Sequence, residues 1–328
     1  MKLFLSTLNQ MGVLGTFMII GFILGKLGIL KKSSTKAISR MENNIFLPAL
    51  VMYTFIENFN MSTLSSSWKP LLLSLAIELV IIPISIIIAR RCSKSDFLRR
   101  MYTYGLCFSN FGFMGNAVVS ALFPEYYTAY IIFTLPLWVL IYVWGVPGLL
   151  IEREHAPKDK KDRVLSSLKA LINPMFIAML IGAIIGITGL GSKIALDENG
   201  NGIFIMQVVK VCGGCMSPLA MIMTGITFAF IDFKKVIKTI SIYVVTLLRL
   251  IVYPLVIGGL FLLIDRLVVS IDQTFYVCLV CSVAMPLGLN TIVIPSAYGK
   301  DTSVPAGMAL VSHVLSIVTI PLVMAILL

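Results

Sequence analysis

The chain contains 328 residues, of which 58% are hydrophobic and 12% are charged. Together with a mean hydropathy of +0.98, this composition lies far outside the range of soluble domains and predicts a polytopic membrane protein. The formal net charge of +11 does not indicate a nucleic-acid partner, because the basic residues are gathered in loops between apolar segments, where they set membrane topology.

Ten apolar segments are long enough to cross a bilayer as helices. They lie at about residues 6–28, 38–58, 70–89, 101–123, 127–151, 170–190, 204–230, 237–263, 274–298 and 302–327. The longest polar connections, residues 151–167 and 191–202, are too short to bury a soluble core. We therefore predict an all-α protein that works within the membrane. An intramembrane enzyme is a further alternative, but the sequence shows no nucleophile, base and orienting group at helical spacing and no His/Asp/Glu metal cluster, so we expect that the protein is not an enzyme. No small-residue cleavage site precedes the first span, so we expect no removable signal peptide.

The basic residues are distributed unequally between alternate loops. Most of the 26 Lys and Arg residues lie at 26–40, 90–100, 153–169 and 234–238 and at Lys300. The opposite set of loops holds only Lys2, Lys69, Lys193, Lys210 and Arg266. Because basic loops tend to remain in the cytoplasm, this distribution predicts that both termini lie outside. We expect the protein in the cell inner (plasma) membrane.

The second half of the chain repeats features of the first half at an offset of about 170 residues. The segment NNIFLPALVMYTF aligns with GGCMSPLAMIMTG, which matches Pro48 to Pro218. Five spans per half is an odd number, so the two halves would enter the membrane from opposite sides. We expect two inverted five-helix repeats, residues 1–163 and 164–328.

The fourth and ninth spans are interrupted in their middle. In the ninth, Pro286 removes a backbone donor and Gly288 weakens the helix, and Asn290 follows where a second half-helix would begin. The fourth span has the same plan, with its break expected at Gly112, Gly115 and Asn116. Unpaired backbone in the hydrocarbon is tolerated only where it is buried in protein or lines a cavity, so two matching breaks indicate a transporter's binding site.

Each second half-helix would direct its N-terminus toward the middle of the membrane, and such a terminus is equivalent to about half a positive charge. Two termini suit a monoanion such as a carboxylate, held by backbone amides and by the side chains of Asn116 and Asn290. Simple capping of the breaks is the alternative role for these two side chains. Asn110 and Ser109 are further candidates.

Glu78 and Arg249 lie near the middle of the third and eighth spans, at matching positions of the repeat. An isolated charge there costs about 2.5–3.5 kcal/mol, so we expect the two residues to face each other as a buried pair. The pair could simply hold the bundle together, or Glu78 could be a proton-coupling carboxylate poised by the arginine.

Other polar residues in the spans have less specific roles. Asn43 and Asn44 precede Pro48, and both Pro48 and Pro218 free backbone carbonyls, so we expect helix–helix hydrogen bonds here. His313 is the only histidine within a predicted span, and we interpret it as a packing group rather than a proton relay.

Two pairs of cysteines, Cys212/Cys215 and Cys278/Cys281, have the CxxC spacing of some metal and redox sites. Both pairs fall within predicted spans, where cysteines three residues apart are ordinary small packing groups. We therefore expect no metal site and no cofactor.

Several motifs together resemble the auxin efflux carrier family of membrane transporters. They are FLPAL at 46–50, SNFGFMGN at 109–116, and AMPLGLNT followed by AYGKD within 284–301. The resemblance implies the ten-span fold shared with plant PIN-FORMED carriers and bile acid symporters, in which spans four and nine cross at the substrate site. It also implies a scaffold of spans 1, 2, 6 and 7, a moving domain of spans 3–5 and 8–10, and a homodimer.

By this resemblance, Asn110, Gly112, Gly115 and Pro286 fall on motif positions of the crossover. Family members often have a proline shortly after the second glycine of the fourth span, where this chain has Asn116 and then an alanine. The long central hydrophilic loop of the plant carriers is missing, which favours a compact prokaryotic type. Similar bacterial proteins are associated with small carboxylates such as malate or malonate.

The sequence therefore predicts a secondary active transporter of a small organic anion, such as malate, malonate or an auxin-like acid, that works by elevator-type alternating access. Coupling to H⁺ or Na⁺ is left open, and the sequence contains no nucleotide-binding motif. The alternative is a membrane receptor or sensor that binds the anion without moving it. Binding without flux in liposomes would identify the receptor.

Overall fold

The computed structural model describes residues 2–151, 174–194, 203–268, 270–297 and 300–328. Within these ranges every named element is a helix or a helical turn. Several features of the sequence prediction lie partly or wholly outside the described residues: most of the polar connections 151–167 and 191–202, the boundary between the repeats at residue 163, the start of the segment 170–190, and residues 298–299 of the AYGKD motif.

Six helices are long and apolar enough to cross a membrane. Three are single helices, α1 (Lys2–Lys26), α4 (Met61–Cys92) and α11 (Phe204–Ala229). A fourth is the single helix α17 (Ser303–Leu327). The other two are composite. One consists of η3 (Pro124–Tyr126), α7 (Tyr127–Leu140) and η4 (Ile141–Leu150), and the other consists of α13 (Ile240–Leu247), η5 (Leu248–Val252) and α14 (Tyr253–Leu267). These helices confirm the predicted all-α polytopic membrane protein.

Shorter helices occupy the other four apolar segments. They are α2 (Ser34–Met41), η1 (Glu42–Phe46) and α3 (Leu47–Asn58); α5 (Asp96–Cys107), η2 (Phe111–Gly115) and α6 (Asn116–Leu122); α9 (Pro174–Ile187); and α15 (Gln273–Val283) and α16 (Asn290–Ala297). Two further short helices, α10 (Gly191–Ile194) and α12 (Phe233–Lys238), belong to connections. The π-helical turns η1 and η5 each come just before a proline, Pro48 and Pro254. Proline cannot donate to the preceding turn, which accounts for the widened turn at both places.

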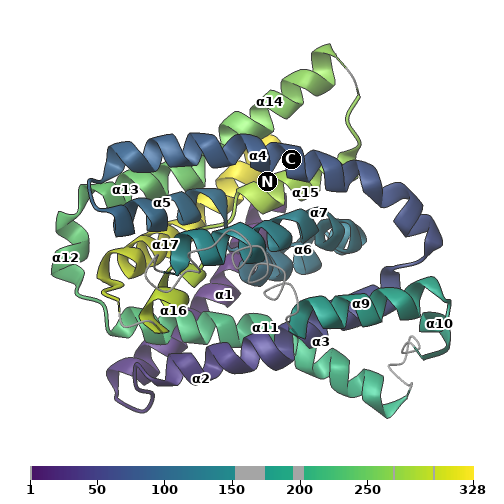
Figure 1. Cartoon of the computed structure of the whole chain (residues 1–328), viewed down its shortest axis with the longest axis horizontal. Coiled ribbons are helices and arrows are strands. Elements are labelled where there is room, and N and C mark those ends of the chain that lie inside the picture. Colours follow the sequence, from purple (N-terminus) through teal and green to yellow (C-terminus); the bar gives the residue numbers. More distant parts are fainter. Residues whose placement is uncertain (1, 152–173, 195–202, 269, 298–299) are drawn as a thin grey trace, which may run out of the picture.

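Two glycine-mediated contacts join one group of helices. The helix α1 lies against α11, and α3 lies against α9 and α11 (Figure 1). A side chain at Gly21 of α1 would overlap the carbonyl oxygen of Ile222 on α11, and one at Gly186 of α9 would overlap the carbonyl oxygen of Phe59 after α3. The missing side chains let these backbones approach closely, as is common between membrane helices.

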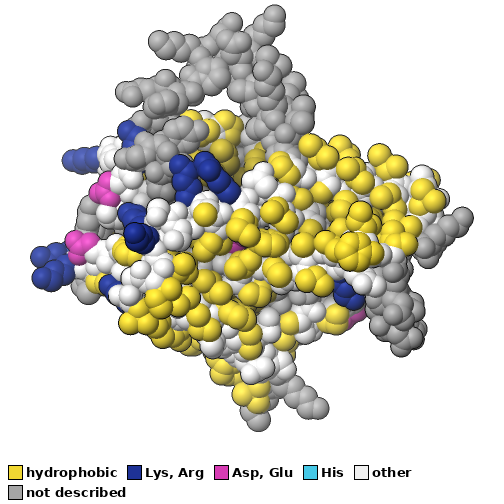
Figure 2. Space-filling model, turned by 90° about the horizontal axis from the view of Figure 1, so that it is seen from below, with side chains coloured by type: hydrophobic (Ala, Val, Ile, Leu, Met, Phe, Trp, Pro, Cys, Tyr) yellow, Lys and Arg dark blue, Asp and Glu magenta, His cyan; other side chains and the backbone are white. Residues whose placement is uncertain are grey.

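The remaining long helices surround the interrupted ones. The helix α4 packs against α5 and α7, and α17 packs against α1, α13 and α14. The hydroxyl of Thr7 in α1 lies 3.8 Å from the sulfur of Met324 in α17, so the two ends of the chain lie side by side. Large exposed aliphatic side chains cover much of the molecule, while Lys and Arg gather toward one end of the face shown in Figure 2. An apolar surface with basic residues gathered toward one end suits a protein that lies in a bilayer with its basic loops on one side.

Candidate functional site

Two breaks in the helices meet in the middle of the molecule. One separates α5 from η2 at residues 108–110, and the other separates α15 from α16 at residues 284–289. Ser109 and Leu287 form an antiparallel bridge between the two extended segments. The amide of Asn110 donates to the carbonyl of Pro286 at 2.7 Å, and the amide of Gly288 donates to the carbonyl of Phe108 at 3.2 Å. Each break thus supplies partners for the backbone groups that the other exposes.

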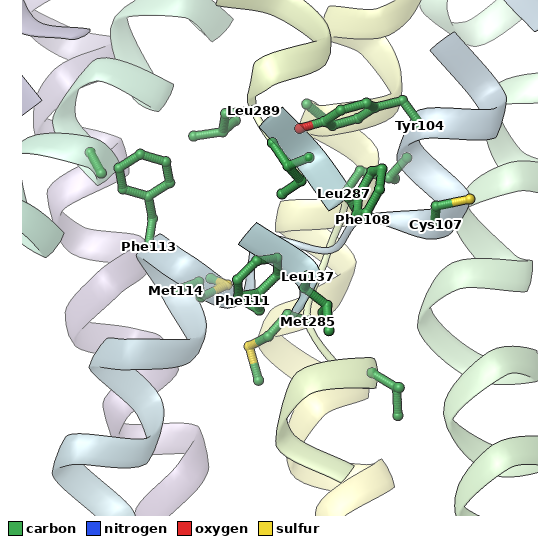
Figure 3. Close-up of a cluster of buried hydrophobic side chains, with 14 of the residues drawn as sticks. Tyr104, Cys107, Phe108, Phe111, Phe113, Met114, Leu137, Met285, Leu287 and Leu289 are labelled. Carbon is green, nitrogen blue, oxygen red and sulfur yellow. The ribbon is translucent and has the colours of Figure 1, made fainter. Parts of the chain in front are cut away.

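The ninth segment breaks where the sequence predicted. Pro286 and Gly288 lie in the extended segment, and α16 begins at Asn290. A side chain at Gly288 would lie 3.1 Å from the carbonyl oxygen of Phe108, so glycine allows the two backbones to pair. Apolar side chains, including Phe108 and Leu287, gather around the bridge (Figure 3).

The fourth segment breaks earlier than the sequence predicted. The helix restarts at Phe111, so Asn110 precedes its first residue and Asn116 lies more than one turn inside it. The expectation that Asn116 stands at the break is therefore wrong. The break lies at 108–110 because those residues pair with the other extended segment, whereas Gly112 and Gly115 lie within η2.

The two glycines of η2 serve packing. A side chain at Gly112 would collide with the indole of Trp138, and one at Gly115 would collide with the phenol of Tyr130. The Tyr130 hydroxyl donates to the carbonyl of Phe111 at 3.1 Å. The helix α7, which carries both aromatic residues, therefore fixes the position of the restarted helix.

The two asparagines that were expected to hold the anion already have partners for their amide nitrogens. Asn116 donates to the carbonyl of Gly112 at 2.7 Å within its own helix and is buried. Asn290 is partly buried and donates to the hydroxyl of Tyr104 on α5 at 2.9 Å, which ties α16 to the first half of the fourth segment.

Asn110 makes a contact that sequence reasoning missed. Its side-chain nitrogen lies 3.0 Å from Nε2 of His313 on α17, and both residues are buried. His313 Nδ1 lies 2.8 Å from the carbonyl of Ala309, and a carbonyl only accepts, so Nδ1 carries the hydrogen. Nε2 of the neutral ring therefore accepts from Asn110, whose Oδ1 is buried without a hydrogen-bond partner. No sequence signal connects two residues so far apart.

Arg249 binds the ends of both broken helices. This fully buried side chain donates to the carbonyl of Leu106 at 2.9 Å, of Met285 at 3.3 Å and of Ser282 at 3.4 Å. These carbonyls belong to the last turn of α5 and to the end of α15, where helical partners run out. The C-termini of helices carry partial negative charge, so the guanidinium is stabilised there. Ser109 donates to the same Ser282 carbonyl at 2.7 Å.

Glu78 is buried and lines a small cavity together with Arg249. The expected direct ion pair between them is not formed, since no Glu78 oxygen lies within 4.0 Å of an Arg249 nitrogen among the described residues. The guanidinium instead points its donors at the three carbonyls. The Glu78 Oε1 atom is buried and has no hydrogen-bond partner.

The asparagines near Pro48 do not form the expected helix–helix hydrogen bonds. Asn43 donates to the carbonyl of Ser39 at 2.9 Å and Asn44 donates to that of Arg40 at 2.7 Å, both one turn earlier in the chain. The preceding turn offers the nearest acceptors, so both amides bond locally. Pro48 lies in the first turn of α3, and Pro218 lies inside α11.

Besides Tyr130, two side chains outside the interrupted helices donate to the restarted fourth helix. Gln10 of α1 donates to the carbonyl of Ala117 at 3.2 Å, and Ser217 of α11 donates to the carbonyl of Phe113 at 3.2 Å. Neither was predicted, because a polar residue in an apolar span does not by itself reveal its partner.

A cleft of about 750 Å³ lies between the connection from α1 to α2, the ends of η4 and α11, and the region from α16 to α17. Its charged lining residues are Lys32, Lys36, Arg40, Asp232, Lys300 and Asp301. Basic residues outnumber acidic ones, so the cleft attracts anions. Ile292 and Ile294 of α16 also line it, which brings the cleft to the second half of the ninth segment.

The cysteines pack as small side chains. Cys278 and Cys281 are buried, Cys212 and Cys215 are half-buried, and all six thiols are free. In the part of the chain that the structure describes, no group of three or more His, Cys, Asp or Glu residues could hold a metal ion.

Comparison with known proteins identifies the family of the chain. No curated protein matches the chain. The family described as "Membrane transport protein" matches residues 9–324, almost the whole chain. The chain therefore belongs to this membrane transport protein family, the auxin efflux carrier family, and is a membrane transporter.

Proposed function

We propose that the protein is a secondary active transporter of a small organic anion, held where the two interrupted helices cross. Malate, malonate and auxin-like acids are the candidate substrates. The observation that carries the proposal is the paired break at Ser109 and Leu287, because it places irregular backbone deep within an apolar molecule. Such backbone is typical of transporter binding sites.

The charge of the crossover favours an anion. The half-helices that begin at Phe111 and Asn290 direct their N-termini at the bridge, and together these termini are equivalent to about one positive charge. Arg249 adds a full charge close by, at the opposite helix ends. We expect the anion to contact the first amides of η2 and α16, with the side chains of Asn110 and Asn290 beside it.

The architecture that we infer is ten spans in two inverted repeats, residues 1–163 and 164–328. Its support is a reciprocal contact: the first span meets the seventh through Gly21, and the sixth meets the second through Gly186. A two-fold axis in the membrane plane that exchanges spans 1 and 6 also exchanges spans 7 and 2, so it turns one contact into the other. These four spans form the scaffold, and spans 3–5 and 8–10 form the transport domain.

We infer that the structure represents an inward-facing state. The cleft of about 750 Å³ is lined by segments rich in Lys and Arg, which the positive-inside rule places in the cytoplasm. This orientation leaves both termini outside, with the protein in the inner (plasma) membrane. The cleft lies between elements of the scaffold and elements of the transport domain. An elevator movement of the transport domain would close it and open the site to the other side.

Among the described residues, two of the polar contacts that such a movement would break join the scaffold to the restarted fourth helix. Gln10 and Ser217 belong to the scaffold, and their partners, the carbonyls of Ala117 and Phe113, belong to the transport domain. In a background without other cysteines, an added oxidant that joins the thiols of Gln10→Cys and Ala117→Cys in a disulfide should hold the domains together and stop transport. Reducing the disulfide should restore transport. Full activity of the cross-linked protein would refute the elevator movement.

Uptake by proteoliposomes tests the function itself. Purified protein should take up labelled malonate, malate or an auxin-like acid, and imposed H⁺ or Na⁺ gradients should reveal coupling. Binding of these acids without flux would favour the receptor alternative, and neither binding nor flux would refute the proposal. Cross-linking in the membrane should recover the homodimer that the family resemblance implies.

A further inference from the structure

Glu78 lines a small cavity beside the crossover that the proposed site does not use. The cavity has a volume of about 10 Å³, which is close to the minimum that accommodates one water molecule. Glu78 reaches it from α4, and the walls come from α5, α7, α15 and η5. Glu78 is 3% exposed, and its Oε1 has no hydrogen-bond partner.

The neighbouring hydroxyl groups are already used in other hydrogen bonds. Ser74 and Ser282 line the cavity, and each donates to a carbonyl three residues earlier in its own helix. The hydroxyl of Tyr253 is hydrogen-bonded to Ser85 at 2.9 Å. A charged carboxylate at Glu78 therefore lacks the donors that a buried anion needs, whereas a carboxylic acid carries its own hydrogen.

Three titratable or charged groups face Glu78: Arg249 on η5, Cys107 on α5 and Tyr253 on α14. The residues of α7 and α15 that line the cavity are apolar, apart from Ser282. Only Arg249 carries a charge among these groups, and its hydrogen bonds go to backbone carbonyls instead of Glu78. Arg249 therefore keeps its position whether Glu78 is ionised or neutral.

We propose that Glu78 binds the proton that is transported together with the anion; this inference rests on the proposed function and names its coupling ion. The carboxylate takes a proton from the aqueous phase and becomes a carboxylic acid. The charge of Arg249 is then no longer compensated, so the crossover binds the anion more tightly. Loss of the proton restores the compensating negative charge and weakens anion binding. Proton and anion thus promote each other's binding, as reciprocal coupling requires.

The cavity suits a proton better than a sodium ion. A sodium ion needs several oxygen ligands around it, and this cavity has room for about one small molecule and holds a guanidinium in its wall. The charge of Arg249 would repel a second cation. A proton needs only the one carboxylate oxygen.

The test compares Glu78→Gln with Glu42→Gln in the full-length protein reconstituted in liposomes. Glu42 on η1 is the matched control, since it is also fully buried and neither of its carboxylate oxygens has a hydrogen-bond partner. The probes are labelled malonate and malate, with a pH-sensitive dye inside the vesicles. For the wild type and Glu42→Gln, lowering the external pH should lower the apparent KM at least several-fold, and acid uptake should accompany anion uptake.

Glu78→Gln imitates the protonated acid, so its KM should be low and independent of pH, and its anion uptake should carry no protons. A pH dependence and proton uptake equal to those of the wild type would overturn the inference while leaving the transport function intact. A wild type that moves none of the acids would instead refute the proposed function.

A second measurement needs no variant. Dicyclohexylcarbodiimide reacts with protonated carboxyl groups in apolar surroundings, and mass spectrometry locates the adduct. Modification of Glu78 that falls as the pH rises supports the inference. A Glu78 that stays unmodified at every pH at which the wild type transports would overturn it.

Discussion

Replacing Arg249 with methionine should destabilise the protein far more than neutralising Glu78. The substitution removes one hydrogen bond of 2.9 Å and two longer ones of 3.3 and 3.4 Å. A hydrogen bond to a charged group contributes about 1.5–3 kcal/mol, and the two long ones lie at or below the lower limit. Relief of the desolvation cost of the buried guanidinium offsets part of the loss, so we expect a net destabilisation of about 3–5 kcal/mol.

Glu78→Gln should change the free energy of unfolding by less than about 1 kcal/mol, because Oε1 of Glu78 has no hydrogen-bond partner among the described residues that the substitution could remove. If a direct ion pair with Arg249 held the bundle, removing either partner would instead cost about 3–5 kcal/mol. The contrast between the two variants therefore separates a carbonyl-binding arginine from an ion pair.

Chemical unfolding in detergent micelles can measure both changes. Trp138 packs against Phe111 with ring centroids 5.0 Å apart and Trp144 packs against Phe108 at 6.2 Å, so the fluorescence of these tryptophans reports on the packing around the two breaks. Arg249→Lys is the matched control, because lysine keeps the charge but lacks the planar guanidinium that reaches several carbonyls at once. Its free energy of unfolding should lie between those of the wild type and Arg249→Met. Equal losses for Glu78→Gln and Arg249→Met would refute the reasoning, as would an Arg249→Met protein as stable as the wild type.

Two further predictions concern helix packing and the Asn110 contact. Gly21→Ala should lower the free energy of unfolding by about 1–3 kcal/mol, because the new methyl group overlaps the α11 backbone. Gly12→Ala is the control: there is open space around Gly12, so the free energy of unfolding should rise by about 0.5–1 kcal/mol. Equal unfolding midpoints for the two variants would contradict the close contact. His313→Leu leaves the Asn110 amide without its acceptor and should cost about 1–3 kcal/mol, while His313→Gln can still accept and should cost less. A leucine variant as stable as the glutamine variant would show that this hydrogen bond contributes nothing.

Local chemistry explains why several features could be predicted from the sequence. Apolar segments of spanning length require a bilayer, which is why the membrane class and the long helices were predicted correctly. Pro286 and Gly288 disrupt a helix wherever they stand, so the break before Asn290 was placed correctly. Glu78 and Arg249 were expected to be buried because charged residues in an apolar span avoid lipid.

The tertiary structure decided which groups meet. The fourth segment breaks at 108–110 instead of near Asn116 because the position of that break depends on pairing with residues 286–288 from the other half of the chain. Arg249 binds carbonyls rather than Glu78 because two helices end beside it. Helix propensity and hydropathy act over a few neighbouring residues and can be read along the chain. Hydrogen bonds between distant segments depend on where the folded chain places their atoms.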